Sequence, residues 1–135
     1  MSLVKTDALQ GKTSAGDITV TSEGGAATQS LQQGLAKAWC NLNGTGTIAQ
    51  RDSLNHSSTT DNTTGTYTFS LVSSMGNTNY ISPTNCDRII DTRNGTEGVQ
   101  YLNIATGSYK IECVNSVPNL SDEELVNTQT LGGLA

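Results

Sequence analysis

Alternating apolar and polar residues predict several β-strands in this chain. The clearest segment is 66–72, where Tyr67, Phe69 and Leu71 alternate with Thr and Ser residues. Weaker versions of this pattern occupy residues 37–43, 47–54, 79–81, 88–90, 99–105 and 108–114. Asn43-Gly44 and Thr106-Gly107 separate neighbouring segments and are typical of hairpin turns. The pattern therefore predicts an antiparallel β-structure assembled from hairpins.

The remaining segments have a different pattern. Residues 3–6 and 17–22 are short strand-like pieces separated by glycines, and they need a pairing partner. Ser30 and Gln33 have the spacing of a helix-capping box, so residues 30–36 predict a short helical turn. Residues 56–66 are polar throughout and predict a loop. Ser121 followed by three acidic residues predicts a helix that ends near Thr130.

Composition adds that one chain has little apolar material for a core. The sequence holds 20 Thr, 14 Ser, 14 Gly and 12 Asn, together 60 of 135 residues, whereas Leu, Ile, Val and Phe contribute 27. Such a composition suits a Thr-rich β-protein that shares its core with other copies. Seven basic residues and a net charge of −5 argue against nucleic-acid binding. We see no apolar run long enough for membrane insertion and no apolar secretory signal region.

These observations predict a mainly β fold, a small antiparallel β-sandwich or barrel-like head. We expect an N-terminal strand-rich attachment segment over residues 1–29, the head over 30–117, and a tail with a short C-terminal helix over 118–135. The attachment segment would use four apolar residues: Leu3, Val4, Ile18 and Val20. The predicted core residues are Trp39, Cys40, Leu42, Ile48, Tyr67, Phe69, Leu71, Tyr101, Tyr109, Ile111 and Cys113. If Trp39 is a core residue, Trp39→Ala should cost about 3–5 kcal/mol.

Candidate chemistry is sparse. His56 lies near Asp52 and Ser53, but residues so close in sequence rarely converge into a catalytic triad. A second oxygen-rich cluster lacks the spacing of a calcium-binding loop; it comprises Asp87, Asp91, Asn94 and Glu97. We therefore expect no catalytic residue, no metal site and no cofactor. Saccharide binding stays open, with stacking faces on Trp39, Tyr67, Tyr80 and Tyr101.

Three cysteines, Cys40, Cys86 and Cys113, form no metal-binding pattern. Without a visible secretory signal we expect buried, reduced thiols. One internal disulfide, or one link between subunits, is the alternative.

Residues 37–71 resemble a segment found in bacteriophage and prophage virion proteins. The shared pattern begins with Lys37, Trp39 and Asn41, continues through the turn 43–47 and the Arg-Asp-Ser sequence at 51–53, and includes Asn55, Ser57, Ser58, 60–62, Gly65 and Tyr67. This match covers about a quarter of the chain. Residues 1–29 are similar, with lower specificity, to fibre-shaft segments.

The resemblance implies a structural component of a virion, most simply a short tail fibre that aids host attachment. A capsid decoration or head-fibre protein is one alternative, and a carbohydrate-binding receptor module is another. It also implies a homotrimer, partners among the tail or capsid proteins, and contact with a host surface glycan. The protein would be made in the bacterial cytoplasm and reside on the virion surface.

Overall fold

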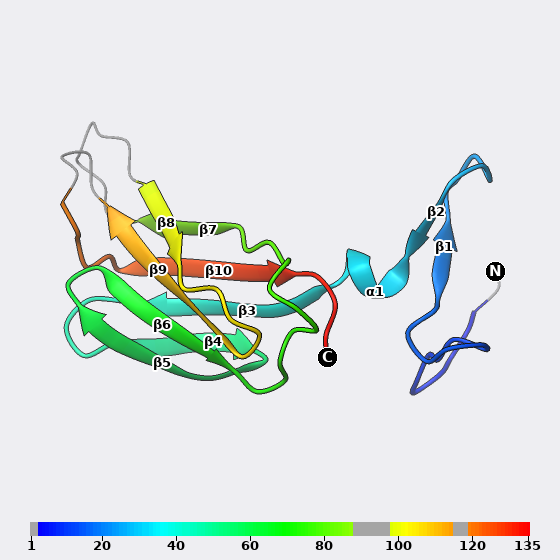
Figure 1. Cartoon of the computed structure of the whole chain (residues 1–135), viewed down its shortest axis with the longest axis horizontal. Helices are drawn as coiled ribbons and strands as arrows, with labels where there is room; N and C mark the ends of the chain where they lie inside the picture. The colour runs from blue at the N-terminus through cyan, green and yellow to red at the C-terminus, as the bar shows by residue number, and fades with distance from the viewer. Residues whose placement is uncertain (1–2, 88–97, 115–118) are drawn as a thin grey trace. The chain divides into compact units, whose positions relative to one another are not determined.

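The computed structural model describes residues 3–87, 98–114 and 119–135. The chain forms two compact units, Met1–Leu35 and Ala36–Ala135 (Figure 1). The observed boundary follows Leu35, six residues after the expected end of the attachment segment at residue 29, because the short helix after the first hairpin belongs to the first unit. The division also places the expected tail within the second unit, because the tail contributes a central strand there.

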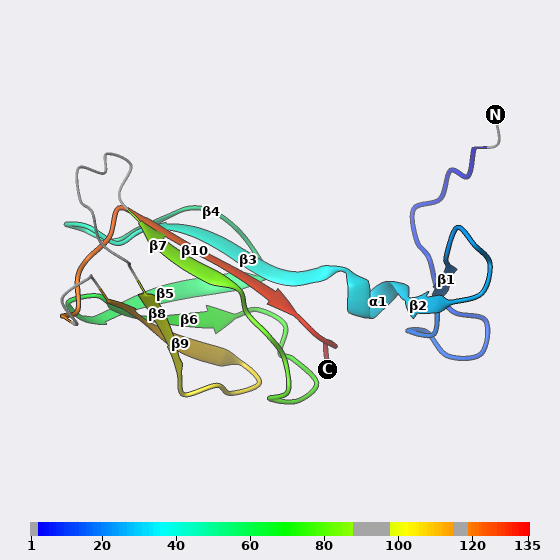
Figure 2. The same ribbon diagram turned by 90° about the horizontal axis from the view of Figure 1, so that it is seen from above.

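The second unit, here called the head, is a β-sandwich of two antiparallel four-stranded sheets, which confirms the predicted fold class (Figure 2). The first sheet has the strand order β4 (Ala49–Leu54), β3 (Ala36–Asn43), β10 (Leu125–Leu131) and β7 (Thr84–Asp87). The second has the order β5 (His56–Thr63), β6 (Thr66–Leu71), β9 (Ser108–Val114) and β8 (Gly98–Leu102).

Side chains from the facing surfaces of both sheets form one core. On β6 and β9 the predicted alternation holds, since Tyr67, Phe69, Tyr109 and Ile111 are completely buried. The Phe69 and Tyr109 rings stack with their centroids 5.3 Å apart. The buried hydrophobic set is Ala38, Cys40, Leu42, Tyr67, Phe69, Leu71, Met75, Tyr80, Cys86, Tyr109, Ile111, Cys113 and Val126. The head therefore has a continuous core within a single chain.

In the described part of the head, three pairs of consecutive strands form hairpins, and the alternation and turn residues predict two of them. β3 pairs with β4, and β8 pairs with β9. The connection after Asn43 spans residues 44–48 and is longer than the two-residue turn that Asn43-Gly44 predicts. Gly44 instead donates its backbone N–H to Glu123 O at 3.0 Å, which binds this loop to the segment before β10.

The predicted loop at residues 56–66 is wrong, because His56–Thr63 form strand β5. β5 is an edge strand whose side chains are mostly exposed on both faces, so it shows no apolar alternation. Backbone pairing with β6 holds it in the sheet, and Gly65 (φ 66°) makes the tight turn between the two strands. A Cβ at Gly65 would lie 2.6 Å from Ser121 N, so this turn requires glycine.

The predicted helix over residues 121–130 is also wrong. Leu125–Leu131 form β10, which lies between β3 and β7. The strand does alternate, but Val126, Thr128 and Thr130 supply its buried positions. Because two of the three buried positions are threonines, the sequence of this strand shows no alternation of apolar and polar residues. Tyr109 donates its hydroxyl to Thr128 Oγ1 at 2.7 Å, which satisfies one of these buried groups.

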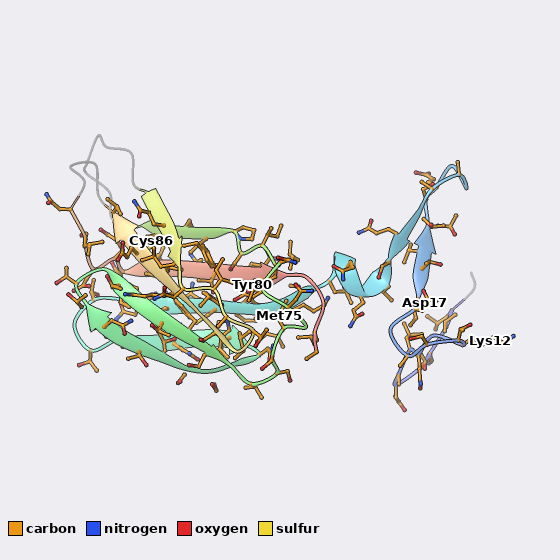
Figure 3. All side chains as sticks on the ribbon, in the orientation of Figure 1. Lys12, Asp17, Met75, Tyr80 and Cys86 are labelled. Atoms are coloured by element: carbon orange, nitrogen blue, oxygen red, sulfur yellow. A yellow bond between two sulfur atoms is a disulfide. The ribbon has the colours of Figure 1, made fainter. Side chains whose placement is uncertain are left out.

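Two short strand predictions also change. Residues 3–6 form no strand, and the prediction at 79–81 reduces to an isolated bridge between Ile81 and Leu131. The predicted strand at 88–90 and the turn at 93–95 lie outside the described residues. The connection between β6 and β7 folds Met75 and Tyr80 over one end of the core (Figure 3). There Tyr80 donates its hydroxyl to Ala105 O at 2.9 Å.

The expectation of three reduced thiols is wrong for two cysteines. Cys86 on β7 and Cys113 on β9 form a disulfide that joins the two sheets, with their Cα atoms 5.9 Å apart. The sequence could not show this pairing, because it depends on two strands of facing sheets that lie 27 residues apart. Cys40 remains a free, buried thiol.

The first unit consists of a small hairpin and one helical turn. β1 (Thr19–Thr21) pairs with β2 (Thr28–Ser30), and α1 (Leu31–Gly34) follows directly. Ser30 accepts the backbone N–H of Gln33, as the capping pattern predicts. Among the described residues, no helix has the length and hydrophobicity needed to cross a membrane.

Candidate assembly surface

The first unit has no buried residue among those described. Leu3 and Val4, two predicted attachment residues, are 71% and 81% exposed. Val20 is also exposed, whereas Ile18 is half-buried. A two-stranded hairpin without a core is at best marginally stable in water. The unit therefore gains little stability from its own side chains, and its apolar groups remain available to a partner.

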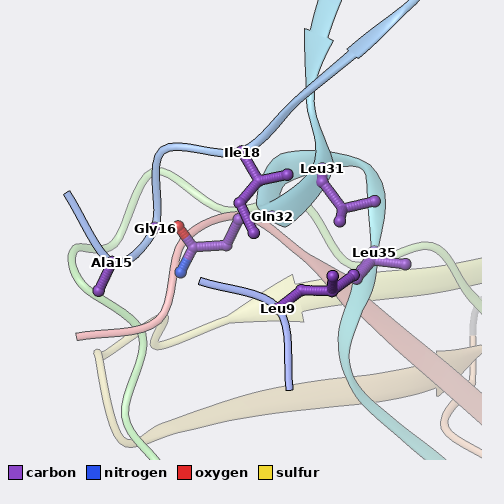
Figure 4. Close-up of a pocket in the computed structure, with 7 residues that line it drawn as sticks. All are labelled: Leu9, Ala15, Gly16, Ile18, Leu31, Gln32 and Leu35. Carbon is purple, nitrogen blue, oxygen red and sulfur yellow. The ribbon is translucent and has the colours of Figure 1, made fainter. Parts of the chain in front are cut away.

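Apolar side chains of this unit surround a depression of about 320 Å³ (Figure 4). Ile18 comes from the approach to β1, Leu31 from α1, and Leu9 from the irregular segment before the hairpin. The full lining is Leu9, Ala15, Gly16, Ile18, Leu31, Gln32 and Leu35. No ionisable side chain contributes to it, so the depression suits an apolar partner.

A second apolar surface lies on the head, at the end of the sandwich where β3 begins; we call this the proximal end. The connection that follows β6 contacts two other segments there. Leu71 donates its N–H to Gly107 O, just before β9, and Gly76 donates its N–H to Gly133 O, just after β10. Asn55, which lies between β4 and β5, contacts the same connection by accepting the N–H of Ser73 at 2.7 Å. The C-terminus lies at the same end (Figure 1).

Exposed apolar residues of the head concentrate at the proximal end. Of the six large exposed hydrophobic residues that the described part of the head contains, five lie there: Leu54, Val72, Ile81, Ile104 and Leu134. Only Leu120 lies toward the opposite end, near the β5–β6 turn. A depression of about 460 Å³ at the proximal end is lined by Ala36, Lys37, Leu54, Asn55, Val72, Ser73 and Leu134. Exposed apolar side chains that gather at one end of a domain indicate an interaction site.

Lys37 is the one charged residue that lines this depression, and it is 6% exposed. Burial lowers the pKa of its ammonium group, since desolvation disfavours the charged form. Lys37 lies where β3 and β10 shift register, between the pairs Ala38–Thr130 and Ala36–Leu131. The irregularity brings a long side chain beneath the apolar surface.

The structure distributes the predicted core residues over two environments. Eight of the eleven are buried in the core, and Ile48 and Tyr101 pack against it while remaining half-buried. The prediction of a core position is wrong for Trp39, which is half-buried on the outward face of β3, between the inward-facing Ala38 and Cys40. Its truncation should cost less than the value expected for a core tryptophan.

The candidate triad does not assemble. His56 faces inward with Nε2 3.3 Å from the Tyr109 hydroxyl, and burial lowers its pKa to about 4. Asp52 instead accepts the backbone N–H of Ser53 at 2.8 Å. Asp91, Asn94 and Glu97 of the oxygen-rich cluster lie outside the described residues. The part of the chain that the structure describes holds no group of three metal-ligating side chains.

Of the predicted stacking residues, Tyr67 and Tyr80 are unavailable to a ligand. Tyr67 is completely buried, with its hydroxyl 2.9 Å from Gly44 O and 3.0 Å from Asp122 Oδ1. Burial raises the pKa of Tyr67, and burial raises that of Tyr80 to about 12. Tyr101 stacks on Tyr109 with ring centroids 5.5 Å apart. Trp39 is therefore the one aromatic residue on the outer surface of a sheet.

Comparison of the chain with protein-family models, curated protein sequences and solved structures found no match.

Proposed function

We propose that this protein is a structural component of a bacteriophage virion, a short surface fibre whose head projects from the particle. The observation that carries the proposal is the segregation of exposed apolar side chains. They occur throughout the first unit and at the proximal end of the head, to which that unit is covalently joined. Among the described residues of the head, Leu120 is the one large exposed hydrophobic residue away from that end. This separation fits a head whose proximal end is in contact with partners and whose opposite end is in solvent.

The resemblance of residues 37–71 to virion proteins supports the same role. Its residues fall on β3, β4, β5 and the start of β6, which form one edge of the sandwich. Arg51 contacts both this segment and the approach to β10: its Nη1 donates to Leu42 O at 3.2 Å and to Glu124 O at 2.6 Å. The Arg-Asp-Ser part of the pattern thus has a structural role in this chain.

The proposed assembly is a homotrimer that contacts tail or capsid proteins. In this arrangement the copies bury their first units and proximal ends against one another and against the particle. The head already has its own core, so the apolar shortage implied by composition falls on the first unit. The disulfide between the sheets also suits a protein that works on a virion surface outside the cell, where such bonds form and persist.

A capsid decoration protein is the alternative within the same class, since an anchored first unit serves either location. Mass spectrometry of purified particles and cryo-electron microscopy test the proposal together. We expect the chain among the particle proteins, at a copy number that fits trimers, with head density projecting from the tail. Density on the capsid would establish the decoration role, and absence of the chain from the particle would refute both.

A further inference from the structure

The outer face of the first sheet carries a row of polar side chains that the assembly role does not use. In register across the four strands lie Asp52, Asn41, Asn127 and Asn85. Next to this row, Trp39 of β3 is the cross-strand neighbour of Gln129 of β10. Between β10 and β7 the surface forms an open depression of about 290 Å³, lined by Pro83, Thr84, Asn85, Asn127, Thr128 and Gln129.

Hydrogen bonds on the sheet hold part of this row in place. Asn41 donates its Nδ2 group to Asn127 Oδ1 at 2.8 Å, and Arg51 Nη1 donates to Asn41 Oδ1 at 3.3 Å. The side-chain oxygen of Asn127 therefore has a partner, and its Nδ2 group is directed away from that bond. An amide fixed in this way presents a donor without a further loss of side-chain entropy.

The chemistry of the depression favours an uncharged, hydroxyl-rich ligand. Three of its lining residues, Asn85, Asn127 and Gln129, carry amides, which both donate and accept hydrogen bonds. None of the six lining residues carries a charge, although the whole chain has a net charge of −5. The neighbouring Trp39 offers an apolar ring next to these polar groups.

The same observations argue against another protein as the occupant. A protein interface core is enriched in apolar groups, and the large exposed hydrophobic residues of the head gather at its proximal end instead. Leu54, the cross-strand partner of Trp39, lines the proximal depression and marks where this face meets the proximal end, whereas the lining between β10 and β7 contains no large hydrophobic residue.

We propose that this face binds a neutral saccharide, with hydroxyl groups bonded to Asn85, Asn127 and Gln129 and a sugar ring against Trp39. The inference deepens the proposed surface role by naming a ligand class for the exposed head, and it rests on that role for its biological setting. The binding itself is a property of the isolated chain and can be measured without the particle.

Trp39 is the single tryptophan of the chain, so tryptophan fluorescence reports on the surroundings of this residue alone. The full chain would be titrated with neutral oligosaccharides of glucose, galactose and mannose, and with uronic-acid oligosaccharides as a charged comparison. We expect the neutral probes to change the Trp39 emission and to shift the side-chain amide NMR signals of Asn85, Asn127 and Gln129. Charged probes should bind at least tenfold more weakly.

Asn85→Ala and Gln129→Ala should each weaken binding about tenfold, because each variant removes an amide that bonds the saccharide. Both residues are exposed, so their truncation leaves the core unchanged. Gln100→Ala is the matched control: it removes an exposed amide from β8 of the other sheet and should leave the affinity unchanged. No response to any neutral probe would overturn the inference, as would equal weakening by the control. Concentration-dependent amide shifts without saccharide would also overturn it, because they would identify a contact between copies.

These outcomes separate the two proposals. Binding by a chain that is absent from particles would leave the saccharide site standing and refute the virion role. A chain present in particles that binds no neutral saccharide would do the reverse.

Discussion

Buried polar side chains determine much of the chemistry of the head at the scale of single residues. His56 faces Phe69 and Tyr109, with ring centroids 5.5 Å and 5.9 Å from its own. Its pKa falls to about 4 because burial penalises the imidazolium form. The pKa of the Cys40 thiol is instead raised, to about 11, because burial and then the nearby Asp52 charge disfavour the thiolate.

His56 should make the head less stable in mild acid. The unfolded chain protonates His56 below its ordinary pKa near 6.5, whereas the folded chain resists protonation down to about 4. The stabilisation is therefore complete above pH 6.5 and is lost as the pH falls toward 4. Linkage gives a loss of about 2 kcal/mol between pH 6.5 and pH 5. Urea unfolding at both pH values measures it.

His56→Phe keeps an aromatic ring against Phe69 and removes the titration. The variant should lose much less stability than the parent over the same pH range. An equal loss in both proteins would assign the pH dependence to the carboxylates instead.

Two aromatic truncations test the inward and outward faces of the sandwich. Phe69→Ala removes a completely buried ring and should cost about 3–5 kcal/mol in the free energy of unfolding. Trp39→Ala removes a half-buried ring from the outer face and should cost about 1–2 kcal/mol, because less apolar area returns to water. Chemical denaturation of the two variants compares them directly. A larger cost for Trp39→Ala would contradict the assignment of the two faces.

At the scale of elements, the sheets are joined by side chains more than by backbone. Gln50 of β4 donates to Thr59 of β5 at 2.8 Å, Tyr109 of β9 donates to Thr128 of β10, and the disulfide links β7 to β9. β7 is a short edge strand paired on one side with β10. The disulfide therefore fastens a four-residue edge strand of the first sheet to the second sheet.

Reduction of the Cys86–Cys113 bond should destabilise the head by about 3–4 kcal/mol, the loop-entropy value for a closure of this length. Guanidinium unfolding with and without reductant measures the effect. The double variant Cys86→Ala/Cys113→Ala should show no response to reductant, while Cys40→Ala should respond like the parent. If the parent unfolds at the same denaturant concentration under both conditions, the bond does not contribute as proposed.

At the scale of the whole molecule, the distribution of exposed apolar residues distinguishes the two ends of the head. Leu134 at the proximal end is 37% exposed and Leu120, toward the opposite end, is 38% exposed. The two residues thus have the same side chain and almost the same exposure. They differ in their surroundings, because Leu134 lines the proximal depression together with Leu54 and Val72.

Leu134→Glu combined with Val72→Asp should weaken self-association at least tenfold, because both charges would enter the proposed contact between copies. Leu120→Glu should leave the association unchanged. Sedimentation equilibrium of the full chain gives the oligomeric state of each protein. A parent chain that stays monomeric at high concentration would refute the trimer, and equal effects of the two changes would refute the proximal contact.

How much the sequence predicts depends on where apolar residues alternate with polar ones. The alternation at Tyr67–Leu71 and Tyr109–Cys113 identified two central strands and six of the thirteen buried hydrophobic residues among those described, because every second side chain there must leave water. The same rule failed for β5, which is exposed on both faces, and for β10, whose buried positions include Thr128 and Thr130. The acidic residues before β10 resemble the first turn of a helix in sequence. In the structure they precede a strand, and Glu123 is buried with 2% of its surface exposed.

By itself, the sequence determined that this is a β-protein with hairpins, a distinct N-terminal segment and a polar exterior, since those properties follow from local pattern and composition. The tertiary structure alone decided three others. It paired Cys86 with Cys113, placed Trp39 on an outer face beside Gln129, and gathered dispersed apolar residues at the proximal end. Each depends on which strands face or adjoin one another, and strands far apart in the chain carry no local record of their neighbours.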